Sequence, residues 1–150
     1  MNEVFKQVGY IINEYVPEMY SDEIFLLSHL RCIYTEDLEI SEQYLALRTL
    51  EMIYFNGDLT PLRNCPLREL EMIYFNGDLA PLRNCPLEVL WLNKFQGDLA
   101  PLGNCPLREL YMVYYQGDLA PLVNCPLEVL CMDRFQGDLA PLGNCPLLRE

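Results

Sequence analysis

Hydrophobic residues return along this chain at a fixed spacing of 20 residues from Leu47 to Pro146, which gives five units without insertions. Each unit has leucine at its first, fourth, thirteenth and sixteenth positions, methionine or leucine at the sixth, and phenylalanine or tyrosine at the ninth. Apolar residues at positions four and six, with variable residues beside them, indicate a short strand with one buried face. The pattern therefore predicts stacked coils whose apolar columns form a continuous core.

Each unit also repeats Gly-Asp at positions eleven and twelve. The glycine allows positive φ or a close backbone approach where the coil turns, and the aspartate can accept hydrogen bonds from turn amides. The alternative is a calcium site, which needs several oxygens around one ion. One carboxylate per coil is sparse, so we favour the turn. The five aspartates are Asp58, Asp78, Asp98, Asp118 and Asp138.

Five of the seven cysteines occupy position nineteen of the repeat, namely Cys65, Cys85, Cys105, Cys125 and Cys145. A column of identical sites indicates a structural role, and we expect buried free thiols. Adjacent coils would also bring the Cα atoms within the disulfide range of roughly 4.4 to 6.8 Å, so oxidation is a second interpretation. Zinc is the least favoured, because no C-x-x-C pair or nearby histidine accompanies the column.

Residues 27–46 read as a degenerate copy of the repeat that precedes the five units. Its matching residues, each 20 positions upstream of a counterpart, are Leu27, Leu30, Cys32, Ile33 and Tyr34. The copy lacks the Gly-Asp and Asn-Cys-Pro signatures, as a terminal capping repeat often does.

The two ends of the chain differ from the repeats. Apolar residues at helical spacing in residues 1–26, interrupted by Pro17, predict two short helices that cover the first coil. Residues 147–150 begin a sixth unit that is incomplete. An open strand edge there would be covered by further repeats of a longer array, or by another chain in a homodimer.

The L-x-x-L-x-Φ segment, where Φ is apolar, resembles that of the leucine-rich-repeat family, and the rest of each unit looks most like the family's plant-type variety. The residues that carry the likeness in one coil are Phe95, Gly97, Leu99, Asn104 and Cys105. The resemblance implies an α/β solenoid with a short parallel β-sheet on the concave face, turns or 3₁₀ segments on the convex face, and a small α-helical N-terminal cap.

This unit is shorter than is usual for the family, and the missing residues include the asparagine that normally follows the strand. The resemblance therefore leaves the asparagine ladder at that point open. A second asparagine column lies just before each strand and could take its place; it consists of Asn64, Asn84, Asn104, Asn124 and Asn144.

The charge and composition of the chain restrict the classes of binding partner that we expect. The formal net charge of −12 disfavours nucleic acid and anionic membrane surfaces. No stretch approaches the roughly 18 apolar residues of a membrane span, and the N-terminus lacks the basic and apolar regions of a secretory signal. We therefore expect a cytoplasmic protein that binds neither nucleic acid nor membrane.

Catalytic machinery is not visible in the sequence. The single histidine, His29, lies in a segment that reads as structural, and no second candidate base accompanies a cysteine or serine. Phosphate-binding glycine loops and the H-E-x-x-H zinc motif are absent as well. We expect no enzymatic activity, no cofactor and no metal.

A partner would meet the residues between the inward leucines, at repeat positions two, three, five, seven and eight. These positions vary between coils, and the aromatic residues Trp91, Tyr111 and Tyr114 form our best candidate patch. Drift among duplicated copies is the competing explanation of the variation. The full candidate set is Tyr54, Tyr74, Trp91, Lys94, Tyr111, Tyr114 and Arg134.

Position two mixes arginine with glutamate, so we expect opposite charges to pair across coils; its residues are Arg48, Arg68, Glu88, Arg108 and Glu128. The leading functional hypothesis is a non-catalytic protein-binding module that uses the concave face. The second is a substrate adaptor of a ubiquitin ligase, because Val16-Pro17-Glu18 followed by Ile24-Phe25-Leu26-Leu27 is loosely similar to the opening of an F-box. The third is a purely structural or degenerate duplicate without a specific partner.

Overall fold

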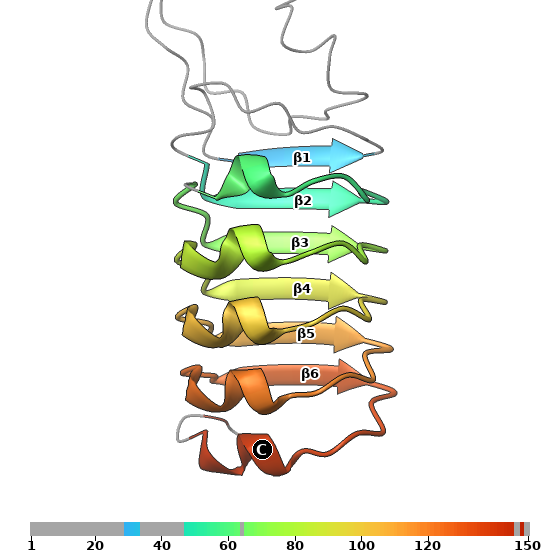
Figure 1. Ribbon diagram of the computed structural model, residues 1–150, viewed down its shortest axis with the longest axis vertical. Helices are drawn as coiled ribbons and strands as arrows, with labels where there is room; N and C mark the ends of the chain where they lie inside the picture. Colours follow the sequence, from blue (N-terminus) through green and yellow to red (C-terminus); the bar gives the residue numbers. More distant parts are fainter. Residues whose placement is uncertain (1–28, 34–46, 64, 146–147, 149–150) are drawn as a thin grey trace, which may run out of the picture.

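The computed structural model describes residues 29–33, 47–63, 65–145 and 148. Six parallel strands form one sheet in chain order (Figure 1). They are β1 (His29–Ile33), β2 (Thr49–Ile53), β3 (Glu69–Ile73), β4 (Val89–Asn93), β5 (Glu109–Val113) and β6 (Val129–Asp133). The expected N-terminal helices, the F-box-like segment and most of the incomplete sixth unit lie outside the described residues.

The sheet register repeats the sequence period. Each strand from β2 onward occupies positions three to seven of its unit, and its residues pair with those 20 places away, as Trp91 does with Tyr111. The degenerate unit contributes β1, whose His29 pairs with Thr49 in the same register. Residues at the same repeat position therefore stand side by side along the whole sheet.

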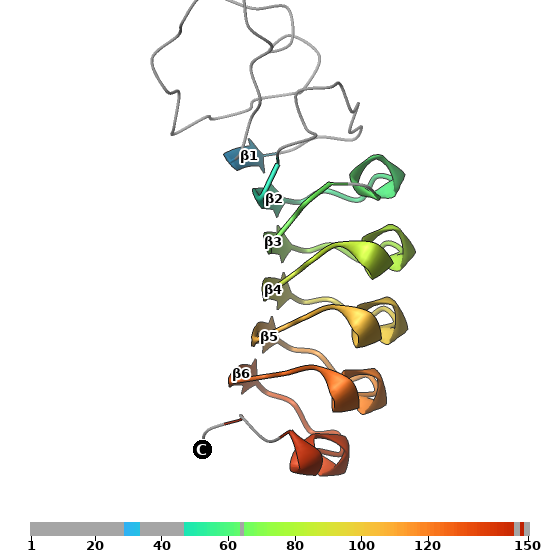
Figure 2. The same cartoon turned by 90° about the vertical axis from the view of Figure 1, so that its left-hand side faces the viewer.

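The opposite side of each coil is a short 3₁₀ helix, and the row of strands bows gently so that the strand side is the concave one (Figure 2). A proline near the start of each helix favours this conformation, since its φ is already fixed. The helices are η2 (Thr60–Leu62), η3 (Ala80–Asn84), η4 (Ala100–Asn104), η5 (Ala120–Asn124) and η6 (Ala140–Asn144). Among the described residues, no helix has the length and apolar character needed to cross a bilayer.

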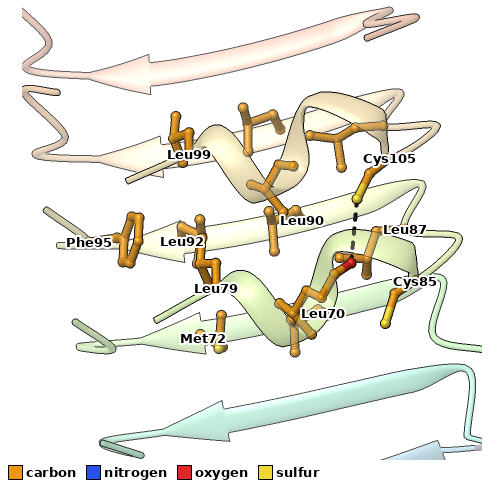
Figure 3. Close-up of a cluster of buried hydrophobic side chains, with 14 of the residues drawn as sticks. Leu70, Met72, Leu79, Cys85, Leu87, Leu90, Leu92, Phe95, Leu99 and Cys105 are labelled. Atoms are coloured by element: carbon orange, nitrogen blue, oxygen red, sulfur yellow. Dashed lines mark hydrogen bonds between the residues drawn. The ribbon is translucent and has the colours of Figure 1, made fainter. Parts of the chain in front are cut away.

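Between the strands and the 3₁₀ helices lies one continuous core made of the predicted apolar columns (Figure 3). In the central coil Leu87, Leu90, Leu92, Phe95 and Leu99 are each at most 1% exposed. Each such side chain contributes on the order of 1.5 to 3 kcal/mol through burial. Because the covering atoms belong largely to neighbouring coils, stability accumulates at the interfaces between repeats.

The repeated glycine makes room for an aromatic ring. None of the described glycines has positive φ, so the expectation of positive φ at position eleven is wrong. The alternative, a close approach, is confirmed: a Cβ atom on Gly97 would lie 2.5 Å from Cζ of Phe95, and one on Gly77 would lie 2.6 Å from Cζ of Phe75. The ring of position nine folds back against the backbone two residues later, and only glycine leaves that space.

The aspartate after this glycine holds the start of the 3₁₀ helix. In all five coils its Oδ1 atom accepts a hydrogen bond of 2.8 Å from the backbone N–H two residues later, as predicted for turn amides. Where a shift is resolved, at Asp58, this bond from Thr60 lowers the pKa of the carboxyl group. In the part of the chain that the structure describes, no three His, Cys, Asp or Glu side chains come together as a metal site.

The last described coil presents part of its core to solvent. Leu139 is 56% exposed, whereas the leucines at the same repeat position in the other coils, such as Leu99 and Leu119, are at most 1% exposed. Met132 and Phe135 are only partly buried against the core. The burial of a core column therefore depends on a following coil, as expected of a solenoid.

Candidate functional site

The strand face is the outward side of β2 to β6, formed by side chains at positions three, five and seven, with positions two and eight as its flanks. In β2 to β5 the strand residues at positions four and six are buried and those at three, five and seven are not. This alternation is that of a strand with one face on a core. All of the candidate binding residues lie on this face or its flank.

Five of the candidates form a column at position eight, which we call the aromatic–cation column; it consists of Tyr54, Tyr74, Lys94, Tyr114 and Arg134. The rings of Tyr54 and Tyr74 stack with centroids 4.6 Å apart. The Nζ atom of Lys94 lies 4.4 Å from the Tyr74 ring centroid and 5.8 Å from that of Tyr114. The guanidinium of Arg134 lies 4.8 Å from the Tyr114 ring centroid. The column is thus a continuous run of ring and cation contacts across five coils.

The backbone of this column is unusual for such large residues. All five have φ between 58° and 67°, the left-handed region that glycine and asparagine adopt most easily. Such a conformation costs on the order of 1 kcal/mol or more per residue. The N–H groups still continue the sheet ladder, since Lys94 N donates to the Val113 carbonyl at 2.9 Å. Large aromatic and cationic side chains therefore point outward from a backbone conformation in which glycine would have the lowest free-energy cost.

A hydrogen bond between Lys94 and Tyr74 ties two coils of the column together. The Nζ atom donates to the Tyr74 hydroxyl oxygen at 3.1 Å. This bond lowers the pKa of Tyr74 and raises the pKa of Lys94. Lys94 is therefore charged at neutral pH and oriented along the column.

Trp91 and Tyr111 form a separate stack at position five. Their ring centroids are 3.9 Å apart and their planes differ by 13°. The Tyr111 hydroxyl donates to Oε2 of Glu109 at 2.9 Å, and this bond raises the pKa of Tyr111. Trp91 is 40% exposed. The predicted patch is thus two groups, because Trp91 stacks with Tyr111 whereas Tyr114 contacts the cations of the aromatic–cation column.

The flank at position two carries the predicted ion pairs. Arg68 pairs with Glu88, and Arg108 pairs with Glu128 at 2.6 Å. All four side chains are at least one-third exposed, so each pair contributes at most about 1 kcal/mol to stability. The pairs join coils two and three and coils four and five, as the mixture of opposite charges at position two predicts.

An amide column at position ten escaped the sequence interpretation. The backbone N–H of Gln96 donates to Oδ1 of Asn76 at 3.2 Å, and its side-chain amide donates to the Tyr114 carbonyl. Gln116 accepts in the same way from the N–H of Gln136 at 3.1 Å. These bonds fix the turn beside the aromatic–cation column. The signal was present in the sequence, since position ten is always asparagine or glutamine.

The asparagine column before the strands does not take this role. The described side chains of Asn84, Asn104 and Asn124 are exposed, and they make no side-chain hydrogen bond within the described coils.

The cysteine column at position nineteen is buried and its thiols are free, as expected from the sequence. The three central thiols donate to carbonyls of the preceding coil, as Cys105 does to Leu82 at 3.7 Å (Figure 3). Burial raises the pKa of Cys105 to about 11. These thiols are therefore protonated and structural at neutral pH.

Comparison with known proteins identifies the fold. No protein-family model matches the sequence, and no curated protein matches it either. An internalin from Listeria monocytogenes superposes with a TM-score of 0.62 and 22% sequence identity, covering 71% of this chain. An internalin C2 from the same bacterium is also 22% identical, with a TM-score of 0.46, and covers 81% of this chain and 78% of its own.

The chain spans 35% of the length of the first internalin. At this level of identity the likeness concerns the fold alone. Together with the parallel strands, the alternating 3₁₀ helices and the repeat of 20 residues, it shows that the chain has the fold of a leucine-rich-repeat solenoid.

Proposed function

We propose that this chain is a non-catalytic protein-interaction module that binds its partner on the strand face. The observation that carries the proposal is the aromatic–cation column, where large side chains point outward from a backbone conformation that disfavours them. Strained positions of this kind concentrate at functional sites. Tyrosine, tryptophan and arginine are also the residues that contribute most to binding energy in protein interfaces.

The distribution of variation between coils supports the same function. The core positions are nearly identical in all five units, whereas position five reads Glu51, Glu71, Trp91, Tyr111 and Cys131. A purely structural array needs no such difference between coils on one face. Exposed tryptophan and tyrosine rings, held rigid by stacking, offer contact area at a low cost in conformational entropy.

Several finer points belong to the same proposal. A cytoplasmic location, the plant-type class of the repeat and the ubiquitin-ligase adaptor remain predictions from the sequence. A homodimer of this chain is a further prediction from the sequence. Light scattering across a concentration series would measure it.

Quantitative affinity capture from a lysate of the source organism tests the proposal with three baits: the unmodified chain, Trp91→Ala with Tyr114→Ala, and Val123→Ala with Asn124→Ala. Trp91 and Tyr114 lie on the strand face and its flank, whereas Val123 and Asn124 are exposed in η5 on the opposite side. We expect at least one protein that the unmodified chain and the η5 variant retain and the strand-face variant loses. Equal recovery by all three baits would contradict binding on the strand face and favour a structural duplicate.

A further inference from the structure

The centre of the strand face is acidic. The outward positions of β2 to β6 hold five carboxylates and no lysine or arginine; the carboxylates are Glu51, Glu69, Glu71, Glu109 and Asp133. Arg31 of β1 stands in register with Glu51. Two of the strands that carry these carboxylates, β3 and β5, lie on either side of Trp91 in β4.

The cations beside β2 to β6 lie on the flanks of this face, at positions two and eight; they are Arg48, Arg68, Lys94, Arg108 and Arg134. Arg68 pairs with Glu88 and Arg108 with Glu128, both at position two. At position eight, Arg134 lies 3.7 Å from Asp133, and Lys94 donates to Tyr74. The sheet centre around Trp91 thus keeps a local excess of negative charge, within a chain whose formal net charge is −12.

The stacking of Trp91 leaves one face of its indole directed toward these acids. The register places Trp91 between Glu71 of β3 and Tyr111 of β5. Its ring stacks on that of Tyr111, with the centroids 3.9 Å apart and the planes 13° from parallel. The face toward Tyr111 is covered, and the opposite face is on the side of Glu71.

An indole face beside carboxylates suits a cationic side chain. A cation over tryptophan gains from the ring quadrupole, and a carboxylate next to it adds a charge-assisted hydrogen bond. Phosphate or acidic peptide would meet repulsion at the same place. The net charge of the chain would also steer a basic partner toward it over a longer range.

We propose that Trp91, with Glu69 and Glu71 of β3, is the docking site for a lysine or arginine side chain from a basic segment of the partner protein. This inference rests on the proposed function and specifies the chemistry of the partner. It predicts that basic extended segments bind to the middle coils, and that acidic segments do not.

The test uses the full chain and a fluorescein-labelled peptide of alternating arginine and serine, followed by anisotropy at low salt. Trp91 is the single tryptophan, so its fluorescence reports occupancy of the site independently. The variant Glu69→Gln with Glu71→Gln removes two charges from the centre. The matched control, Asp118→Asn with Asp138→Asn, removes two charges from turn positions and keeps the oxygens that accept the backbone N–H bonds.

We expect the peptide to change Trp91 fluorescence, the strand-face variant to bind about tenfold more weakly, and the control to bind within about twofold of the unmodified chain. Trp91→Phe should weaken binding less than Trp91→Ala. Equal weakening by both charge variants would overturn the proposal, because the attraction would be diffuse. Tighter binding of an alternating glutamate and serine peptide would overturn it too, while leaving a strand-face binding function intact. Unchanged unfolding midpoints would establish that the variants are folded.

Discussion

Replacing Gly97 with alanine tests why glycine recurs in every coil. The new Cβ atom would lie 2.5 Å from Cζ and 2.8 Å from Cε2 of Phe95, whereas carbon atoms in contact are normally about 3.5 to 4.0 Å apart. The Phe95 ring cannot move aside easily, because it is 1% exposed and stacks between Phe75 and Tyr115 at 6.3 Å on both sides. Overpacking of this kind costs about 1 to 3 kcal/mol, and we expect the free energy of unfolding to fall by that amount.

Urea unfolding followed by circular dichroism measures the effect, with Gly143→Ala as the matched control. A Cβ atom on Gly143 has no neighbour within 4 Å, so this change should be neutral or stabilise by up to about 1 kcal/mol. Gly97→Ala combined with Phe95→Leu should cost less than the sum of the two changes, because the shorter side chain removes the clash. If Gly97→Ala and Gly143→Ala have equal midpoints, the role assigned to the ring is wrong.

Three other predictions concern the core. In the same urea assay, Leu99→Ala should lower the free energy of unfolding by about 2 to 5 kcal/mol and Leu139→Ala by less than about 1 kcal/mol. The reason is that Leu99 is 0% exposed and Leu139 is 56% exposed. Equal losses would contradict the burial seen in the structure. Tyr115→Phe should change stability by less than about 1 kcal/mol, since it removes only the hydroxyl bonds to backbone carbonyls at 3.2 and 3.5 Å; a larger loss would make this hydroxyl essential. With Cys32 and Cys131 replaced by serine, the native chain should react slowly with a thiol reagent at pH 8 and faster as the pH approaches 11. The reason is that burial raises the pKa of the three central thiols to about 11. Rapid reaction at pH 8 would contradict their burial.

The sign of the thiol effect also predicts how stability depends on pH. The folded chain retains these thiol protons up to about pH 11, whereas the unfolded chain releases them near the ordinary thiol pKa of 9.0. Their contribution to stability is therefore complete below pH 9 and is lost as the pH rises toward 11. Urea midpoints measured across this range should fall, and a rise would contradict the assignment.

The repeat made most of the fold predictable. A strict spacing of 20 residues fixes the register, so the pairing of Trp91 with Tyr111 follows from the sequence alone. The buried columns follow from the apolar positions in the same way. The cross-coil pairing of Arg68 with Glu88 was predictable because their charges are opposite at one repeat position.

Local backbone conformation was not predictable by the same reasoning. Positive φ was one of two explanations offered for the repeated glycine, but it occurs at position eight, on residues such as Tyr74 and Lys94. Here the sheet ladder and the stacked side chains outweigh the intrinsic preference of the residue. The separation of Tyr114 from the Trp91 stack has a related cause, since position eight lies beyond the strand end and its side chains contact those of neighbouring coils.

Site-specific photocrosslinking tests the proposed binding face most directly. A benzophenone amino acid would replace Tyr111 on the strand face in one variant and Val123 in η5 in another, since both side chains reach the surface on opposite sides of the same coil. After incubation with a partner identified by affinity capture, we expect a covalent adduct from position 111 and none from position 123. An adduct of equal or greater yield from position 123 would contradict binding on the strand face.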